Sequence, residues 1–281
     1  MFTPGGCHYP EPAWQAGRVT FQGAIFDVDG VLVDSPHEPA WRDSLRELME
    51  GDWADIAGQT SWTPGGFTSQ VYQKVLSGKP RMSGATDALA YFGVPDAQRR
   101  AEVYAARKQD KVIALIEAGD FKAFPDALRF VLGVKAIGIP TAAASSSKNA
   151  GLMLRQIRLD TFAEENGLTE QFAPVLRPGL TLADALDADI SGRDFAHGKP
   201  APDIFLAAAE ELRQPPESCF VVEDAPSGVQ AAKAGNMWAI GVARSDDADL
   251  LAEQHADLVV ESLDEVDLAE LAAGRLRRRS P

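Results

Sequence analysis

Two aspartates separated by one residue, Asp27 and Asp29, follow directly after the apolar run 23–26. Alternate residues of a strand point to the same side of a sheet, so these carboxylates are expected to lie close together. A divalent cation would relieve their mutual repulsion, and Mg²⁺ suits oxygen ligands. Because open α/β sheets bind ligands at the carboxyl ends of their strands, we interpret the pair as a candidate reactive and metal site. An aspartate-rich turn without chemistry is the plain alternative.

A hydroxyl-rich turn is the second candidate. Hydroxyl and backbone N–H groups at a strand-to-helix turn can hold a phosphate, although the same residues would also serve as an ordinary helix N-cap. Directly after the apolar run 139–144 the sequence reads Ser145, Ser146, Ser147, Lys148 and Asn149.

Charged residues in two later segments complete the set. Lys199 lies in a loop stiffened by two prolines, and a fixed lysine can offer its charge to a phosphoryl group, although most lysines are simply exposed. Glu223 and Asp224 end the apolar stretch 219–222. Either acid could complete a metal site or favour a helix N-terminus. Phosphoryl transfer depends mainly on positioning and charge neutralisation, which these residue types can supply.

Short apolar runs separated by helical patterns predict the elements that must position these groups. Residues 205–212 carry apolar side chains at the i, i+3, i+4, i+7 spacing of an amphipathic helix. Strands that alternate with helices indicate an α/β fold, a Rossmann-like doubly wound parallel sheet with helices on both faces. The strands are expected within 23–26, 139–144, 188–190, 219–222, 238–242 and 257–260.

Residues 36–120 differ because they contain no convincing strand. Apolar residues recur there at helical spacing, which predicts an α-helical cap domain inserted after the first strand. The irregular segment 160–186 could either cover the site or pack outside it. We expect an irregular N-terminal extension over residues 1–19 and a helical cap domain over residues 36–120. The α/β core is expected to consist of residues 20–35 and 121–281.

The formal net charge of -14 argues against nucleic acid as a main partner, because phosphate backbones are bound by clustered basic residues. The basic run 275–279 is interpreted as a solvated chain end. No apolar run approaches the length of a membrane span, and the N-terminus lacks the pattern of a secretion signal. We therefore expect a cytoplasmic protein without a membrane partner, either a monomer or a small homo-oligomer.

The aspartate pair, the hydroxyl-rich turn, the loop with Lys199 and the acid pair at 223–224, in this order along the chain, resemble the motifs of the haloacid dehalogenase (HAD) superfamily of phosphotransferases. The resemblance extends over residues of about 21 to 270. The resemblance implies that Asp27 is a nucleophile that forms an aspartyl-phosphate and that Asp29 is the general acid/base. It implies that Ser145 binds the transferred phosphoryl group, with help from Ser146, and that Lys199 balances its charge.

The same resemblance implies a Mg²⁺ cofactor. The ion would be held by Asp27, by the backbone carbonyl of Asp29 and by Asp224, with Glu223 beside them. The expected substrate is a small phosphorylated metabolite.

Features of the helical insertion resemble the β-phosphoglucomutase-like branch of the superfamily. His37 with Trp41 is similar to that branch's His-x-x-x-Trp, although it stands nearer to Asp27 than in the branch pattern. The loop ending in Arg81 is similar to its Gly-x-x-Arg, which implies a grip on the distal phosphate of a sugar bisphosphate. Arg107-Lys108-Gln109-Asp110 is similar to its Arg-Lys-Asn-Asp, which implies that Lys108 contacts the substrate. Contacts to the non-transferring phosphate are implied for Ser147, Lys148 and Asn149.

The leading interpretation is a β-phosphoglucomutase-like enzyme that moves a phosphoryl group between two hydroxyls of a sugar phosphate. A phosphatase on the same scaffold, in which water takes the phosphoryl group from Asp27, is the first alternative. A dehalogenase is disfavoured because its chemistry has no use for the acidic anchor at Asp224. A non-catalytic binding protein that retains the fold is a further alternative, disfavoured by the presence of every core residue.

Overall fold

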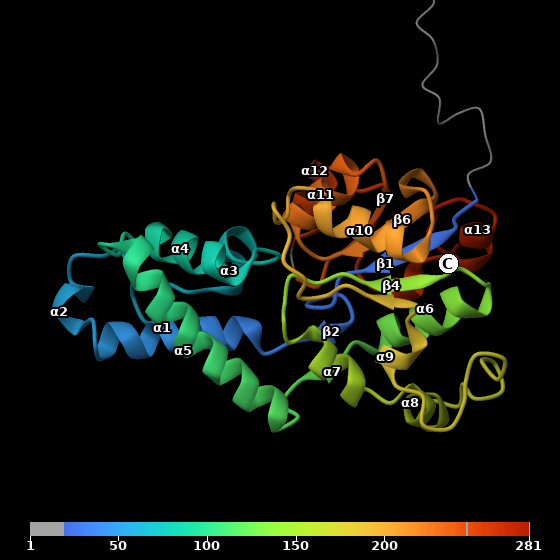
Figure 1. The fold of residues 1–281 in the computed structure, drawn as a ribbon, viewed down its shortest axis with the longest axis horizontal. Helices are drawn as coiled ribbons and strands as arrows, with labels where there is room; N and C mark the ends of the chain where they lie inside the picture. Colours follow the sequence, from blue (N-terminus) through green and yellow to red (C-terminus); the bar gives the residue numbers. More distant parts are fainter. Residues whose placement is uncertain (1–19, 246, 281) are drawn as a thin grey trace, which may run out of the picture.

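The computed structural model describes residues 20–245 and 247–280, and the expected N-terminal extension lies outside the described residues. Within them, the main sheet has six strands in the order β5-β4-β1-β6-β7-β8, and every neighbouring pair is parallel. The predicted doubly wound parallel sheet is therefore confirmed (Figure 1). The strands are β1 (Gly23–Phe26), β4 (Thr141–Ala143), β5 (Ala188–Asp189), β6 (Cys219–Glu223), β7 (Trp238–Val242) and β8 (Leu258–Val260).

Helices cover both faces of this sheet because successive strand residues point to opposite sides. Phe26 and Val222 pack into a core with α6 (Pro125–Ala136), α7 (Ala150–Gln156) and α13 (Leu268–Ala272). Ile25 and Val221 pack into a second core on the other face (Figure 1). The helices of that second face are α10 (Asp203–Leu212), α11 (Pro226–Ala234) and α12 (Ala248–Glu253).

A group of helices forms the inserted cap at one side of the sheet (Figure 1). It has its own apolar core, which includes Trp41, Leu45 and Tyr104. Amphipathic sequence therefore folds here around a core separate from that of the sheet, as the helical spacing predicts. The helices are α1 (His37–Glu50), α2 (Ala54–Ala57), α3 (Ser69–Val75), α4 (Arg81–Tyr91) and α5 (Ala97–Glu117).

The two chain segments that connect cap and core lie side by side. The first contains β2 (Val33–Asp34) and the second β3 (Lys122–Ala123), and the two strands pair antiparallel. The N–H of Phe124 also donates to the carbonyl of Leu32 at 3.0 Å. This pairing could not be predicted from the sequence, because strands of two residues have no hydrophobic period.

Residues 160–186 pack against the core. They contribute α8 (Leu159–Glu165) and α9 (Leu182–Ala185), and Phe172, Leu180 and Leu182 are buried with the α6 side of the sheet. In Figure 1, α8 lies at the lower edge of the core. The segment therefore adds apolar contacts to the core.

The arginines of the basic chain end are exposed to solvent, as interpreted, but the end is not frayed because it is attached to the core. Arg278 forms an antiparallel bridge with Val266, and its guanidinium donates to the carbonyl of Val259 at 3.1 Å. Two 3₁₀ turns, Pro216–Ser218 and Leu263–Glu265, complete the described elements. In the described part of the chain, no helix combines the length and apolar character needed to cross a membrane.

The buried hydroxyl of Tyr104 gives a test of the cap core. It donates to the carbonyl of Trp41 at 2.9 Å, with the two rings in edge contact. Tyr104→Phe should lower the free energy of unfolding by about 1 kcal/mol, because one buried hydrogen bond is lost while the Trp41 carbonyl remains within α1. Urea denaturation measures this, with Tyr91→Phe as the control because Tyr91 is 50% exposed. Equal effects of the two substitutions would contradict the role of the hydrogen bond.

Candidate active site

A buried lysine lies between two carboxylates at the carboxyl ends of β1 and β6. Lys199 Nζ donates to Asp27 Oδ1 at 2.7 Å and to Glu223 Oε1 at 2.5 Å. All three residues are buried, and the lysine also lies over the Phe205 ring of α10 at 4.8 Å. Attraction to both carboxylates outweighs the effect of burial and raises the pKa of Lys199, so this side chain remains a cation.

A cluster of acids surrounds this lysine. Asp27, Glu223 and Asp224 each offer a carboxylate oxygen within 4.8 Å of the others. Burial, helped by the neighbouring Glu223, raises the pKa of Asp224 well above its usual value, and burial raises that of Asp27 to about 8. Among the described residues Lys199 is the one cation paired with these acids, so the three acids in ionised form would leave an excess of two negative charges. Hard oxygen donors with uncompensated charge fit Mg²⁺.

The acids of the cluster differ in how they are engaged. Glu223 binds Lys199 through one oxygen and accepts the Ala225 N–H through the other at 2.9 Å. Both carboxylate oxygens of Glu223 therefore already have partners, and one of them holds Lys199. The sequence did not indicate this role. Asp224 packs against Gly30, where a Cβ would lie 2.0 Å from Asp224 Oδ2 and where φ is +86°. Only glycine fits this turn.

The Asp29 carboxylate turns away from the acid cluster and faces the cap. Its Oδ2 accepts the Ser145 hydroxyl at 2.9 Å, and its Oδ1 lies 3.3 Å from His37 Nε2. The Ser145 oxygen in turn accepts the N–H of Ser147 at 3.0 Å. An acid between a hydroxyl of the core and an imidazole of the cap is well placed to exchange protons with a group bound between the domains.

His37 connects the core to a buried lysine of the cap. Its Nε2 lies 3.0 Å from Ser147 Oγ and its Nδ1 lies 3.4 Å from Lys108 Nζ. Burial lowers the pKa of His37 to about 4 and that of Lys108 to about 8. His37 is therefore neutral at pH 7, whereas Lys108 keeps most of its charge.

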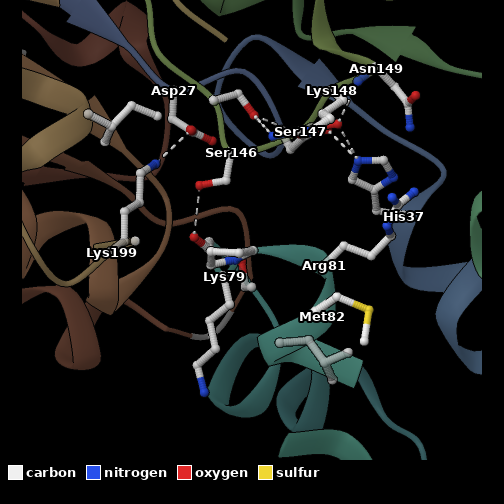
Figure 2. Close-up of a pocket in the computed structure, with 18 of the residues that line it drawn as sticks. Asp27, His37, Lys79, Arg81, Met82, Ser146, Ser147, Lys148, Asn149 and Lys199 are labelled. Carbon is white, nitrogen blue, oxygen red and sulfur yellow. Dashed lines mark hydrogen bonds and ion pairs between the residues drawn. The ribbon is translucent and has the colours of Figure 1, made fainter. Parts of the chain in front are cut away.

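These groups line one cavity of about 310 Å³ between cap and core. In Figure 2, Asp27 and Lys199 lie at one end, and Arg81 extends from the start of α4 toward His37. Of the predicted site residues, only Glu223 and Asp224 are absent from the wall of this cavity, and both are buried; Asp224 lines a second cavity together with Asp29. Residues 160–186 contribute nothing to the wall of this cavity.

Several further residues line the cavity that were not predicted from the sequence. Gln109 of α5 donates to the Asn149 amide oxygen at 2.9 Å, and Lys148 forms an ion pair with Asp194 at 2.9 Å. Gln109 stands beside Lys108 in its motif, which is a signal that could have identified it. The loop before Lys199 carries no such signal, although Arg193, Asp194, Phe195 and His197 also line the cavity.

The parallel sheet, the helical insertion after β1 and the acids at the carboxyl ends of β1 and β6 together define an α/β enzyme of the haloacid dehalogenase class. Residues 21–236 match the family model of the haloacid dehalogenase-like hydrolases, and the chain belongs to this family.

The chain is related to sugar phosphate mutases and phosphatases. It is 32% identical over 265 residues to the β-phosphoglucomutase of Mycobacterium bovis, covering 89% of this chain and 91% of that protein. It is 27% identical over 249 residues to the validoxylamine A 7'-phosphate phosphatase of Streptomyces hygroscopicus subsp. limoneus, covering 88% and 96%. The solved structure of β-phosphoglucomutase from Pyrococcus sp. strain ST 04 matches with a TM-score of 0.62 and 29% identity, over 90% of this chain and 99% of that one.

The carboxylates of Asp29 and Asp224 have different neighbours, and this difference gives a test of metal binding. Asp224→Asn should weaken Mg²⁺ binding at least about tenfold, because even partners outside the ligand set change metal affinity by that much. Asp29→Asn should leave the affinity nearly unchanged, since its carboxylate contacts Ser145 and His37. Isothermal titration calorimetry with MgCl₂ measures both. An equal loss in the two variants would place the Asp29 side chain among the ligands.

Proposed function

We propose that this enzyme is a Mg²⁺-dependent, β-phosphoglucomutase-like phosphotransferase that acts on a small sugar phosphate. The observation that carries the proposal is the chain of contacts from Asp29 through His37 to Lys108. This chain couples the acid/base of the core to a cation of the cap. A mutase needs such a cation, because it must bind a second phosphate while the first is transferred.

In the proposed reaction, an Asp27 oxygen attacks the phosphorus of the substrate. The bond from phosphorus to the sugar oxygen breaks, and Asp29 gives that oxygen its proton. Lys199 and Ser145 balance the charge on the transferred group. Asp29 then takes the proton of a free hydroxyl on a sugar monophosphate as that hydroxyl attacks the phosphoryl group and the bond from phosphorus to Asp27 breaks. When the group on Asp27 comes from a sugar bisphosphate, the first step consumes this bisphosphate and releases a sugar monophosphate, and the second step forms a new bisphosphate.

The metal site follows from the same residues. Asp27, Asp224 and the backbone carbonyl of Asp29 would hold Mg²⁺, with Glu223 fixing Lys199 beside it. When bound, the ion would neutralise negative charge on the phosphoryl oxygens.

The cap contributes positive charge and cover to the cavity, which a phosphatase would not need. Arg81 and Lys108 of the cap bring positive charge to the cavity, which Lys148 of the core also lines. His37 and Lys108 are buried against the core, which restricts water around Asp29. The likeness to the M. bovis mutase over nearly the full length of both chains supports the assignment.

Phosphatase activity on the same scaffold is the second candidate. One observation favours it. Lys148 is already paired with Asp194 and its side chain is 60% exposed, so it is less available to bind a second phosphate. In that reaction, water takes the phosphoryl group from Asp27. The similar validoxylamine phosphate phosphatase shows that relatives with this activity exist.

Product analysis separates the two candidates. The enzyme would be incubated with Mg²⁺, β-glucose 1-phosphate and a trace of glucose 1,6-bisphosphate, with glucose 6-phosphate and free phosphate measured separately. The mutase proposal predicts glucose 6-phosphate with little free phosphate. Free phosphate without isomerisation would make the enzyme a phosphatase.

Arg81→Ala is the matched variant for this assay. It should lower sugar phosphate turnover while sparing the hydrolysis of p-nitrophenyl phosphate, because the aryl ester has no second phosphate. An equal loss on both substrates would contradict a role for Arg81 in gripping that phosphate.

The lowered pKa of Lys108 predicts a pH dependence. The ammonium is charged below its pKa of about 8, so kcat/KM for the sugar phosphate should fall as pH rises through 8. Hydrolysis of p-nitrophenyl phosphate provides the reference for any titration near Asp27. Lys108→Arg should move the alkaline decline upward, since arginine stays charged. The same decline in this variant would assign it to another group.

A further inference from the structure

Arg244, which follows β7, uses its whole guanidinium to hold one region of the core. Its Nε donates to the carbonyl of Gly30 at 3.1 Å and its Nη2 to that of Val31 at 3.0 Å. Its Nη1 donates to Asp126 Oδ2 at 2.8 Å, and the group stacks over the Phe124 ring at 3.9 Å. The side chain is only 15% exposed. Neither the sequence motifs nor the proposed reaction gives this residue a role.

The partners of Arg244 belong to both connections between core and cap. Gly30 and Val31 lie in the turn that leaves Asp29 for the cap, and Phe124 and Asp126 lie where the chain returns from it. A planar guanidinium with several donors in fixed directions can satisfy such a set, whereas an ammonium cannot do so with the same geometry.

Asp126 fixes this group to the remainder of the core. Its Oδ2 also accepts the N–H of Leu263 at 2.8 Å and the hydroxyl of Ser262 at 3.2 Å. Burial alone would raise its pKa, but the hydrogen bonds from Arg244 and Leu263 lower it below the usual value. The carboxylate is therefore ionised at neutral pH and holds Arg244 from the side opposite the turn.

The turn held by Arg244 contacts the reactive acids directly. The N–H of Gly30 donates to the carbonyl of Val33 at 2.8 Å, and Gly30 packs against Asp224. Asp29 is the preceding residue. If the carbonyls of Gly30 and Val31 lost their donor, the turn would be free to relax, and Asp29 would move relative to Asp27 and Asp224.

We propose that Arg244 is a positioning residue for the reaction, which holds the turn after Asp29 so that this acid stays aligned with Asp27. The inference rests on the proposed aspartyl-phosphate chemistry, although not on the choice between mutase and phosphatase. It gives this arginine a part in turnover through the backbone of the turn.

Three variants test the role. Arg244→Met removes all the donors, and Arg244→Lys keeps a cation beside Asp126 without the planar arrangement of donors. Arg129→Met is the control, because Arg129 extends from α6, the helix that carries Asp126, and makes two hydrogen bonds to Asp264, but is not bonded to the turn after Asp29. Each variant would be assayed for kcat and KM on p-nitrophenyl phosphate with saturating Mg²⁺, and for Tm.

The positioning role predicts that Arg244→Met lowers kcat about a hundredfold with KM nearly unchanged, as expected for a small displacement of a reacting group. Arg129→Met should lower Tm while retaining kcat. Arg244→Lys should recover much of the Tm lost in Arg244→Met but little of the kcat. If Arg244→Met does not fold, Arg244→Lys with normal Tm and low kcat carries the same conclusion.

Other outcomes overturn the inference. Normal kcat in Arg244→Met or in Arg244→Lys would limit Arg244 to a structural role. Parallel losses of kcat in the Arg244 and Arg129 variants would do the same. Inactivity of the wild-type enzyme toward p-nitrophenyl phosphate and acetyl phosphate would instead refute the proposed chemistry, and this inference with it.

Discussion

The ion pairs of Lys199 with Asp27 and Glu223 are the interaction on which the rest of the site depends. Burying several carboxylates costs free energy unless nearby positive charge compensates their negative charge. One lysine compensates only part of the negative charge of these acids. Register creates the arrangement: Phe26 pairs with Val222, so the residues that follow, Asp27 and Glu223, emerge side by side. A site that keeps excess negative charge after pairing with Lys199 is suited to a divalent cation and to substrates that bind together with such a cation.

The two sides of the sheet explain how so much charge can be buried. Ile25 and Phe26 point into separate apolar cores, so β1 is held from both faces and the residue after it has a fixed position. The strand interior needs no polar side chain to specify the fold. Charge is instead concentrated at the carboxyl edge, where the cap closes the cavity. Cap and core then contribute complementary charges to the cavity, the acids Asp27 and Asp29 from the core and the cations Arg81 and Lys108 from the cap.

The sequence predicted the parallel sheet and the meeting of Asp27, Ser145, Lys199 and Asp224, because parallel strands place their carboxyl ends at one edge. It could not show that Glu223 holds Lys199, since that contact depends on register between strands. The β2–β3 pairing and the attachment of Arg278 to Val259 were missed because very short strands and exposed arginines carry no periodic signal. Arg244 was missed for another reason: its partners are mostly backbone carbonyls far away in the sequence.

The most direct test of the central claim is to locate the phosphoryl group during turnover. The enzyme would be mixed with Mg²⁺ and ³²P-labelled acetyl phosphate, quenched in acid within milliseconds, digested with pepsin and mapped by mass spectrometry. Nucleophilic catalysis by Asp27 predicts a hydroxylamine-sensitive phosphate on the peptide that contains this residue, formed only with Mg²⁺ and absent from Asp27→Asn. Phosphate on a different residue, or continued turnover by Asp27→Asn, would contradict it.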